Sequence, residues 1–303
     1  MGVLALVHVF GVCASGRHLF RGVFVRILCG GATDVGRVRS NNEDCFRLVQ
    51  PLSLFVLSDG MGGEAHGEIA SALAVETVVK HCMDADTNPA APLYGNPAPG
   101  LAPETKRLVS AVHLANRNIF KSAETNPEQS GMGATLTAMW INGNALSIAH
   151  VGDSRAYLLR NGMLQQLTSD HSLVAEQVRR GIISANEAEQ SDMQSVLLRA
   201  LGTQESVEVD SEEQALFPRD LLLLCSDGLT RMVTEPEIAG TLQAETDPQK
   251  ASERLIAIAN ENGGADNISV IVVRLENESK GWLSWLRPGG RKHASKNGSA
   301  GGH

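Results

Sequence analysis

The feature that most limits the possible folds of this chain is a set of aspartates at the ends of its most apolar segments. Asp59 and Asp227 each end a run of apolar residues and precede a glycine, and Asp266 stands just before another run, residues 268–275. Apolar runs of about four to eight residues between turn residues predict buried β-strands. Because the ends of strands are held rigidly and face solvent, a scaffold can gather carboxylates there.

Helical periodicity brackets these strands. Apolar spacing predicts helices over residues 68–83 and 104–123. Capping boxes begin two shorter helices, at Ser184 with Glu187 and at Thr234 with Glu237. A further helix starts at Asp247-Pro248 and continues to residue 260.

A strand-rich block lies between the two helical regions. Residues 134–141, 145–151 and 155–160 have strand-like patterns, and Asn-Gly and Gly-Asp turns connect them. The block is predicted to be an antiparallel meander, with Asp153 in a tight turn between strands. Helix pairs around two strand-rich blocks predict an α+β protein, with packed sheets and the helices outside.

Charge and cysteine content limit the possible partners and location. The net charge of −8 hides a basic end, since residues 280–303 carry five cations and no acid while the rest holds 21 Lys and Arg against 34 Asp and Glu. An acidic body argues against nucleic acid as a partner. The five scattered cysteines contain no C-x-x-C pair, so we expect neither a disulfide framework nor a zinc site, and a reducing cytoplasm fits best.

The two ends of the chain are expected to differ from the body. Residues 1–22 are interpreted as an N-terminal arm or first strand rather than a signal peptide, because residues 3–12 lack a charged flank and are too short to span a bilayer. The body is placed at residues 23–278. Residues 279–303 are expected to be a flexible basic tail, with a membrane contact through Trp282 and Trp285 as the less favoured alternative.

Carboxylates that converge repel one another unless cations neutralise them. Oxygen ligands without His or Cys favour Mg²⁺, Mn²⁺ or Ca²⁺ over zinc. The alternative for each aspartate alone is an ordinary turn residue, because Asp-Gly and Gly-Asp are common turn sequences.

Motifs in a fixed order decide between these two interpretations. Seven motifs follow one another along the chain: Thr33-Asp34-Val35-Gly36, Arg39-Ser40-Asn41-Asn42-Glu43-Asp44, Ser58-Asp59-Gly60-Met61-Gly62-Gly63, Gly131-Met132-Gly133-Ala134-Thr135, His150-Val151-Gly152-Asp153-Ser154-Arg155, Ser226-Asp227-Gly228-Leu229 and Gly264-Ala265-Asp266-Asn267. In these motifs and in their order the chain resembles the PPM-type (protein phosphatase 2C-like) serine/threonine phosphatases, in particular the bacterial branch. The resemblance covers about residues 31–275.

The resemblance implies a four-layer α-β-β-α sandwich in which two antiparallel sheets are flanked by helix pairs. It also implies a site with two Mn²⁺ or Mg²⁺ ions and, as in bacterial relatives, a third. Asp59 matches the carboxylate that bridges the two ions, Gly60 a backbone carbonyl ligand, and Asp227 and Asp266 the other direct ligands. Asp153 matches a ligand of the third ion.

Further positions of the resemblance concern the reaction. Asp44 matches a residue that holds metal-bound water, with Glu43 beside it as a weaker candidate. Paired cations can activate a bridging water as the nucleophile for in-line attack on phosphorus. Arg39 matches the family's phosphate-binding arginine, and its alternative is a surface ion pair.

The chain departs from the family pattern at the leaving-group acid. Met61 stands where eukaryotic relatives have a proposed histidine acid, and Glu64 stands where many bacterial members have a histidine. Methionine cannot donate a proton, so water or another group must serve. His66 is nearby but is assigned no role, because a lone histidine at a helix start is more often structural.

The predicted function is hydrolysis of phosphoserine and phosphothreonine in proteins, opposing a bacterial serine/threonine kinase in signalling. The substrates are phosphoproteins, including the kinase and its targets, and the enzyme is expected to be a cytoplasmic monomer. The segment from residue 169 to 193 matches a mobile flap beside the site. A phosphoprotein-binding pseudophosphatase and a small-molecule phosphomonoesterase are the alternatives. Asp84-Ala85-Asp86-Thr87 is similar to an aspartate-nucleophile motif but is rejected, because Asn88 departs from it.

Overall fold

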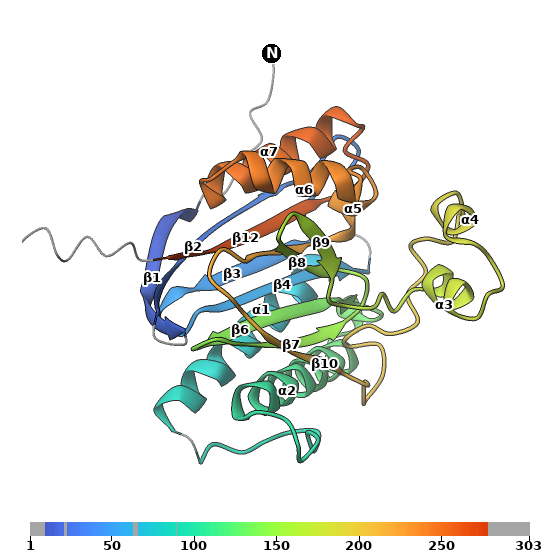
Figure 1. Ribbon diagram of the computed structural model, residues 1–303. Helices are drawn as coiled ribbons and strands as arrows, with labels where there is room; N and C mark the ends of the chain where they lie inside the picture. The colour runs from blue at the N-terminus through green and yellow to red at the C-terminus, as the bar shows by residue number, and fades with distance from the viewer. Residues whose placement is uncertain (1–9, 21–22, 63–65, 89, 278–303) are drawn as a thin grey trace, which may run out of the picture.

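Two antiparallel sheets, stacked face to face, form the centre of the molecule (Figure 1). The structure is a computed structural model that describes residues 10–20, 23–62, 66–88 and 90–277. The first sheet has the order β1 (Phe10–Phe20), β2 (Val23–Asp34), β12 (Ile268–Asn277), β11 (Leu221–Cys225), β8 (Arg155–Arg160), β9 (Met163–Gln166). The second has the order β10 (Asp210–Ala215), β7 (Ala145–Val151), β6 (Leu136–Asn142), β4 (Leu54–Met61), β3 (Asp44–Val49), with β5 (Gly133–Ala134) paired to the end of β4.

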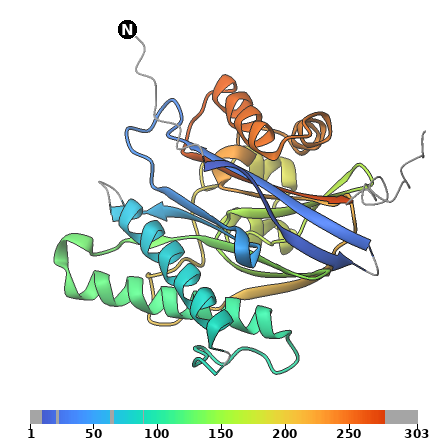
Figure 2. The same ribbon diagram turned by 90° about the vertical axis from the view of Figure 1, so that its left-hand side faces the viewer.

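Helices cover the two outer faces, as Figures 1 and 2 show. The helices α1 (His66–Thr87) and α2 (Pro103–Thr125) pack on the second sheet, and α6 (Glu235–Ala244) and α7 (Pro248–Glu261) pack on the first. The short helices α3 (Leu173–Arg179) and α4 (Ala185–Glu189) project to one side (Figure 1), and α5 (Asp227–Thr230) follows β11 directly. Two 3₁₀ turns, η1 (Gln50–Leu52) and η2 (Pro127–Gln129), complete the elements.

Three hydrophobic layers explain why the sequences of the central strands are unbroken apolar runs. One lies between the sheets, one between the second sheet and α1–α2, and one between the first sheet and α6–α7. In β4, Leu54 and Val56 pack toward α1 and α2, whereas Phe55 and Leu57 pack between the sheets. Successive side chains of a strand point to opposite faces. A strand between two packed layers therefore buries every residue, and β11 shows the same division between the inter-sheet layer and the α6–α7 layer.

The predicted single meander is wrong, because the chain changes sheets within it. The strands β6 and β7 pair in the second sheet, whereas β8 pairs with β11 and β9 in the first. The two Asn-Gly turns do close hairpins, at Asn142-Gly143 and Asn161-Gly162. The turn with Asp153 instead crosses between sheets, and Gly152 has a φ of +113° there. Buried strands carry no pattern that says which neighbour they pair with, so the sequence did not distinguish a hairpin from a crossing.

The predicted boundaries of the body stay predictions. Residues 10–20 of the expected N-terminal segment form β1, which pairs antiparallel with β2. The tail at residues 279–303 and Glu64 lie outside the described residues. No helix in the described ranges combines the length and the apolar character that crossing a bilayer requires.

Candidate active site

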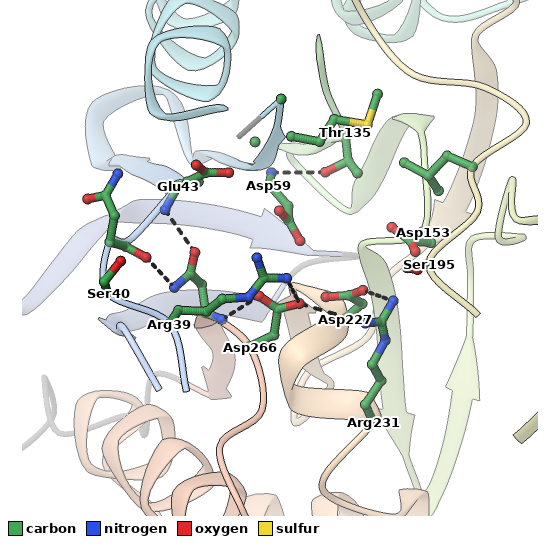
Figure 3. Close-up of a pocket in the computed structure, with 16 residues that line it drawn as sticks. Arg39, Ser40, Glu43, Asp59, Thr135, Asp153, Ser195, Asp227, Arg231 and Asp266 are labelled. Carbon is green, nitrogen blue, oxygen red and sulfur yellow. Dashed lines mark hydrogen bonds and ion pairs between the residues drawn. The ribbon is translucent and has the colours of Figure 1, made fainter. Parts of the chain in front are cut away.

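The aspartates predicted from the strand ends converge on one pocket of about 380 Å³ (Figure 3). Every predicted site residue except Asp44 contributes to its wall. These residues are Arg39, Asp59, Gly60, Asp153, Asp227 and Asp266. Asp44 lies behind the wall, directly opposite Asp59 in the β3–β4 ladder. Segments more than 200 residues apart in sequence therefore place their acidic groups in one place.

The two sheets supply the acids from facing strand ends. Asp59 is fixed near the end of β4 by Thr135, whose Oγ1 accepts from the Asp59 N–H at 2.9 Å and whose own N–H donates to the Asp59 carbonyl at 2.8 Å. Asp227 begins α5 at the end of β11, and Asp266 precedes β12, the neighbouring strand. The inter-sheet layer thus sets the distance across the pocket.

Asn267 holds the loop that carries Arg39 against this strand end. Its amide Nδ2 donates to the carbonyls of Val35 and Asn41 at 3.0 and 2.8 Å, and its Oδ1 accepts from the N–H of Glu43 at 2.8 Å. A single buried amide therefore connects the two walls. The sequence motif contained Asn267, but no pattern assigned it this part.

Burial and mutual repulsion raise the pKa values of four buried acids at the site, Asp44, Asp59, Asp153 and Asp227. Burial raises the pKa of Asp44 to about 7 and that of Asp153 to about 8, and the charges of neighbouring aspartates add to both shifts. Burial, followed by the charges of Asp44 and Asp227, raises the pKa of Asp59 well above its ordinary value. The pKa of Asp227 is raised by burial although Arg231 opposes the shift. A divalent cation bound among these groups would instead favour their ionised forms and lower their pKa values.

The donor set fits hard divalent cations. Asp44 Oδ1 and Asp227 Oδ1 are buried and have no hydrogen-bond partner among the described residues. A buried polar atom without a partner costs free energy, so a ligand that satisfies it is favoured. The wall offers carboxylate and carbonyl oxygen, and its described residues include no His or Cys, which suits Mg²⁺ or Mn²⁺.

The carboxylates do not yet form a complete coordination group. Among the described residues, no three His, Cys, Asp or Glu side chains are placed so that they could hold a metal ion. Two of the carboxylates contact arginines instead. Arg39 donates to Asp266 Oδ2 at 2.9 Å. It therefore forms an ion pair here, which was the alternative to phosphate binding. The pair lies at the pocket, and its acid is a predicted metal ligand. Arg231 pairs with Asp227. Sequence patterns did not indicate Arg231; its spacing of four residues from Asp227 on a helical turn is the signal that could have done so.

Met61 lines the pocket, as its place in the motif predicted, and the described lining residues include no histidine. Ser195 and Leu197, which follow the predicted flap at residues 169–193, are in the pocket wall. Residues of that segment, among them Asp170 and Val174, line a second cavity of about 600 Å³ that shares Asp153, Asp227 and Arg231 with the first.

A pair of buried histidines holds the base of this segment. His171 Nδ1 accepts from the N–H of Gly152 at 3.1 Å, and its Nε2 contacts Asp210 Oδ2 at 3.1 Å. The ring of His150 lies 4.8 Å from that of His171, and its Nδ1 contacts Thr137 Oγ1 at 2.9 Å. His171 thereby ties the turn that carries Asp153 to β10 and to the segment that begins at Ser169, a link that no sequence motif indicated.

Acid should weaken the fold through His150. Burial, followed by the charge of His171, lowers its pKa to about 4. As pH falls below the ordinary value of 6.5 the unfolded chain takes up this proton and the folded chain does not, so stability is lost between pH 6.5 and about 4. From pH 7 to 5 we expect a loss of about 2 kcal/mol from this group.

Urea unfolding at several pH values measures this loss. The matched variant His150→Gln keeps hydrogen-bonding groups for Thr137 and Ser169 and should show a shallower pH slope than the wild type. Parallel slopes in the two proteins would contradict the assignment.

Two stacked antiparallel sheets whose strand ends gather aspartates beside an arginine are the arrangement that the resemblance to metal-dependent phosphatases implies. Comparison with known proteins identifies the family. The sequence profile described as Protein phosphatase 2C matches residues 37–259. The chain belongs to this family.

Individual relatives agree. The serine/threonine phosphatase stp of Listeria monocytogenes is 39% identical over 252 residues, 82% of this chain and 96% of that protein. The crystal structure of the serine/threonine phosphatase PstP of Mycobacterium tuberculosis has a TM-score of 0.72 at 36% identity, covering 83% of this chain and 99% of that one. A structure of the PstP catalytic domain with two manganese ions has a TM-score of 0.71 at 35% identity, over 84% and 100% of the two chains.

These likenesses confirm the predicted family, the α+β sandwich of two antiparallel sheets with outer helices, and the enzyme class. The chain is a metal-dependent protein phosphatase of the Mn²⁺- and Mg²⁺-dependent type. The role of each site residue stays a prediction, because a shared family does not test individual side chains.

Proposed function

We propose that this chain hydrolyses phosphoserine and phosphothreonine in proteins at the pocket of Figure 3. The observation that carries the proposal is the convergence of Asp59, Asp227 and Asp266 from two sheets on one wall. Asp59, the Gly60 carbonyl, Asp227 and Asp266 would hold two Mn²⁺ or Mg²⁺ ions, and Asp153 would hold a third. When bound, such ions activate water as a nucleophile and stabilise charge on the phosphoryl oxygens.

The chain's own groups bind and orient the substrate. Arg39 stands at the rim with 54% of its side chain exposed, so its fork can leave Asp266 and engage two phosphate oxygens from solvent. The hydroxyl of Ser226 donates to Asp44 Oδ2 at 2.9 Å and leaves Oδ1 as an acceptor for an ordered water. This arrangement supports the role proposed for Asp44. Glu43 remains the weaker candidate beside it.

Protonation of the leaving serine or threonine oxygen needs a source other than Met61. The described residues around the pocket include acids, amides and hydroxyls but no imidazole. The proton therefore comes from water or from one of the carboxyl groups. Histidine chemistry of the kind proposed for eukaryotic relatives is not part of this proposal.

The physiological role follows from the substrate class. Phosphoproteins of a bacterial serine/threonine kinase, and the kinase itself, are the proposed partners, and the cytoplasm is the proposed location. The monomeric state and the less favoured membrane contact of the tail stay predictions. A binding-only role is disfavoured because all the aspartates that the family motif requires are present.

Removal and return of divalent ions tests the activity. Protein stripped with a chelator should not hydrolyse p-nitrophenyl phosphate or a phosphothreonine peptide, and added Mn²⁺ or Mg²⁺ should restore both reactions. A panel of phosphorylated metabolites is the matched comparison. Full activity in the stripped protein would overturn the metal assignment, and preference for a metabolite over the peptide would favour the small-molecule alternative.

A further inference from the structure

Arg231 contacts two of the proposed metal ligands, Asp227 and Asp266, although no sequence motif marked it as a site residue. It follows the last residue of α5, and its N–H donates to the carbonyl of Asp227 at 2.9 Å, which fixes its backbone one turn beyond that acid. Its guanidinium forms an ion pair with Asp227 Oδ2, and its other terminal nitrogen lies 3.7 Å from Asp266 Oδ2 (Figure 3). One arginine therefore contacts both carboxylates.

A guanidinium in this place opposes a divalent cation. It uses oxygen atoms that a cation would coordinate, and like charges at such separations repel by amounts that matter for affinity. The tether of one helical turn keeps its effective concentration high. Its side chain is 23% exposed, compared with 54% for Arg39, so solvent screens its pairing less.

The second cavity gives this side chain a place to move. Arg231 lines both cavities, and the exposed acids Glu189 and Glu235 line the second from α4 and from the start of α6. The cavity's other arginine, Arg155, is already held by Asp170 through contacts of 2.7 to 3.1 Å. Arg231 can therefore exchange its carboxylate partners for others without leaving an acidic surface.

We propose that Arg231 is a built-in counter-ion that competes with divalent cations for Asp227 and Asp266 and so sets the metal concentration at which the site fills. Cation binding displaces the guanidinium toward the second cavity. The inference rests on the proposed function, since it takes these two aspartates as metal ligands. Arg231 acts on the affinity of the site for the ion and does not contact the reacting phosphate.

The test compares wild type with Arg231→Gln after both are stripped by chelator. Calorimetric titration with Mn²⁺ alone should show binding to the variant about tenfold tighter than to wild type. The stripped variant should unfold at a lower temperature than stripped wild type, because the acids lose their counter-charge. At saturating Mn²⁺ this difference in unfolding temperature should disappear.

Two matched variants separate charge from shape and from general surface effects. Arg231→Lys keeps the charge and should remain near the wild-type affinity. Arg254→Gln removes an arginine that is 56% exposed and 3.6 Å from Glu261, and it should change neither quantity. If Arg231→Gln bound Mn²⁺ no more tightly than the wild type, the inference about Arg231 would be overturned and the proposed function would stand. Failure of the wild type to bind Mn²⁺ would overturn the proposed function as well.

Discussion

Asp59→Asn should lower the rate of phosphothreonine-peptide hydrolysis by at least about a thousandfold, since a lost ligand of paired cations removes several kcal/mol of transition-state stabilisation. The protein should stay folded, because Asn keeps the shape of the side chain. The N–H of Asp59 and its carbonyl, which bond to Thr135, are main-chain groups and are unchanged by the substitution. Steady-state kinetics at saturating Mn²⁺ measures the loss.

The stability of the same variant separates a site acid from a structural one. Burial and neighbouring acids raise the pKa of Asp59 well above its usual range, so its charge opposes folding when no cation is bound. Stripped Asp59→Asn should therefore unfold at the same temperature as stripped wild type or higher, as expected where function costs stability. Asp86→Asn, an exposed acid in the rejected nucleophile-like motif, is the control and should retain full activity. Comparable losses in both variants would refute the site assignment.

Gly60→Ala should destabilise the protein by at least about 3 kcal/mol and remove its activity. A Cβ at this position would overlap the carbonyl of Gly67 at the start of α1 and lie 2.7 Å from the carbonyl oxygen of Glu43. Both obstacles are backbone atoms, so no side chain can turn away to make room. Because Gly60 is also the proposed carbonyl ligand, any shift that relieves the overlap moves that ligand.

Gly240→Ala is the matched control, and its effect should have the opposite sign. Gly240 lies in α6, and an added Cβ there meets no atom within 4 Å. Alanine at an exposed helix position should raise the free energy of unfolding by about 0.5–1 kcal/mol. Chemical denaturation of the two variants gives both values. A Gly60→Ala protein as stable as the wild type would show that the Gly60–Gly67 approach is looser than the structure describes.

Local signals predicted the elements of this fold well because their causes are local. The strands at residues 145–151 and 155–160 agree with β7 and β8 at both ends. The capping box at Ser184 is formed as predicted, with the Glu187 side chain accepting from the Ser184 N–H at 2.7 Å. Asp247 caps α7 by accepting from the N–H of Gln249 at 2.9 Å.

Strand pairing could not be predicted in the same way. Residues in β8 and β11 are apolar on both faces because helices cover one side and the second sheet the other. Such strands carry no alternation that would reveal their neighbours. The crossing at Gly152 therefore read as one more hairpin, and the edge strand β10, with three acids among its six residues, had no apolar pattern to mark it.

In the site, too, residues marked by local sequence were predictable and contacts that depend on the fold were not. Its aspartates were predictable because each stands at a turn that ends or begins an apolar run, and the family order assigned them together. The contact of Arg231 with Asp266 and the His171–Asp210 pair were not, because they depend on which segments the fold places side by side. Asp210 comes from an edge strand 39 residues beyond His171 and reaches it only through the pairing of β10 with β7.

The central claim is that acids from both sheets together hold divalent cations. Anomalous X-ray scattering from crystals soaked in Mn²⁺ tests it most directly. We predict manganese peaks in the pocket within coordination distance of Asp59, Asp227 and Asp266, with Arg231 turned away from Asp227. Manganese bound only elsewhere, with Asp227 and Asp266 still paired to arginines at saturating Mn²⁺, would contradict the account.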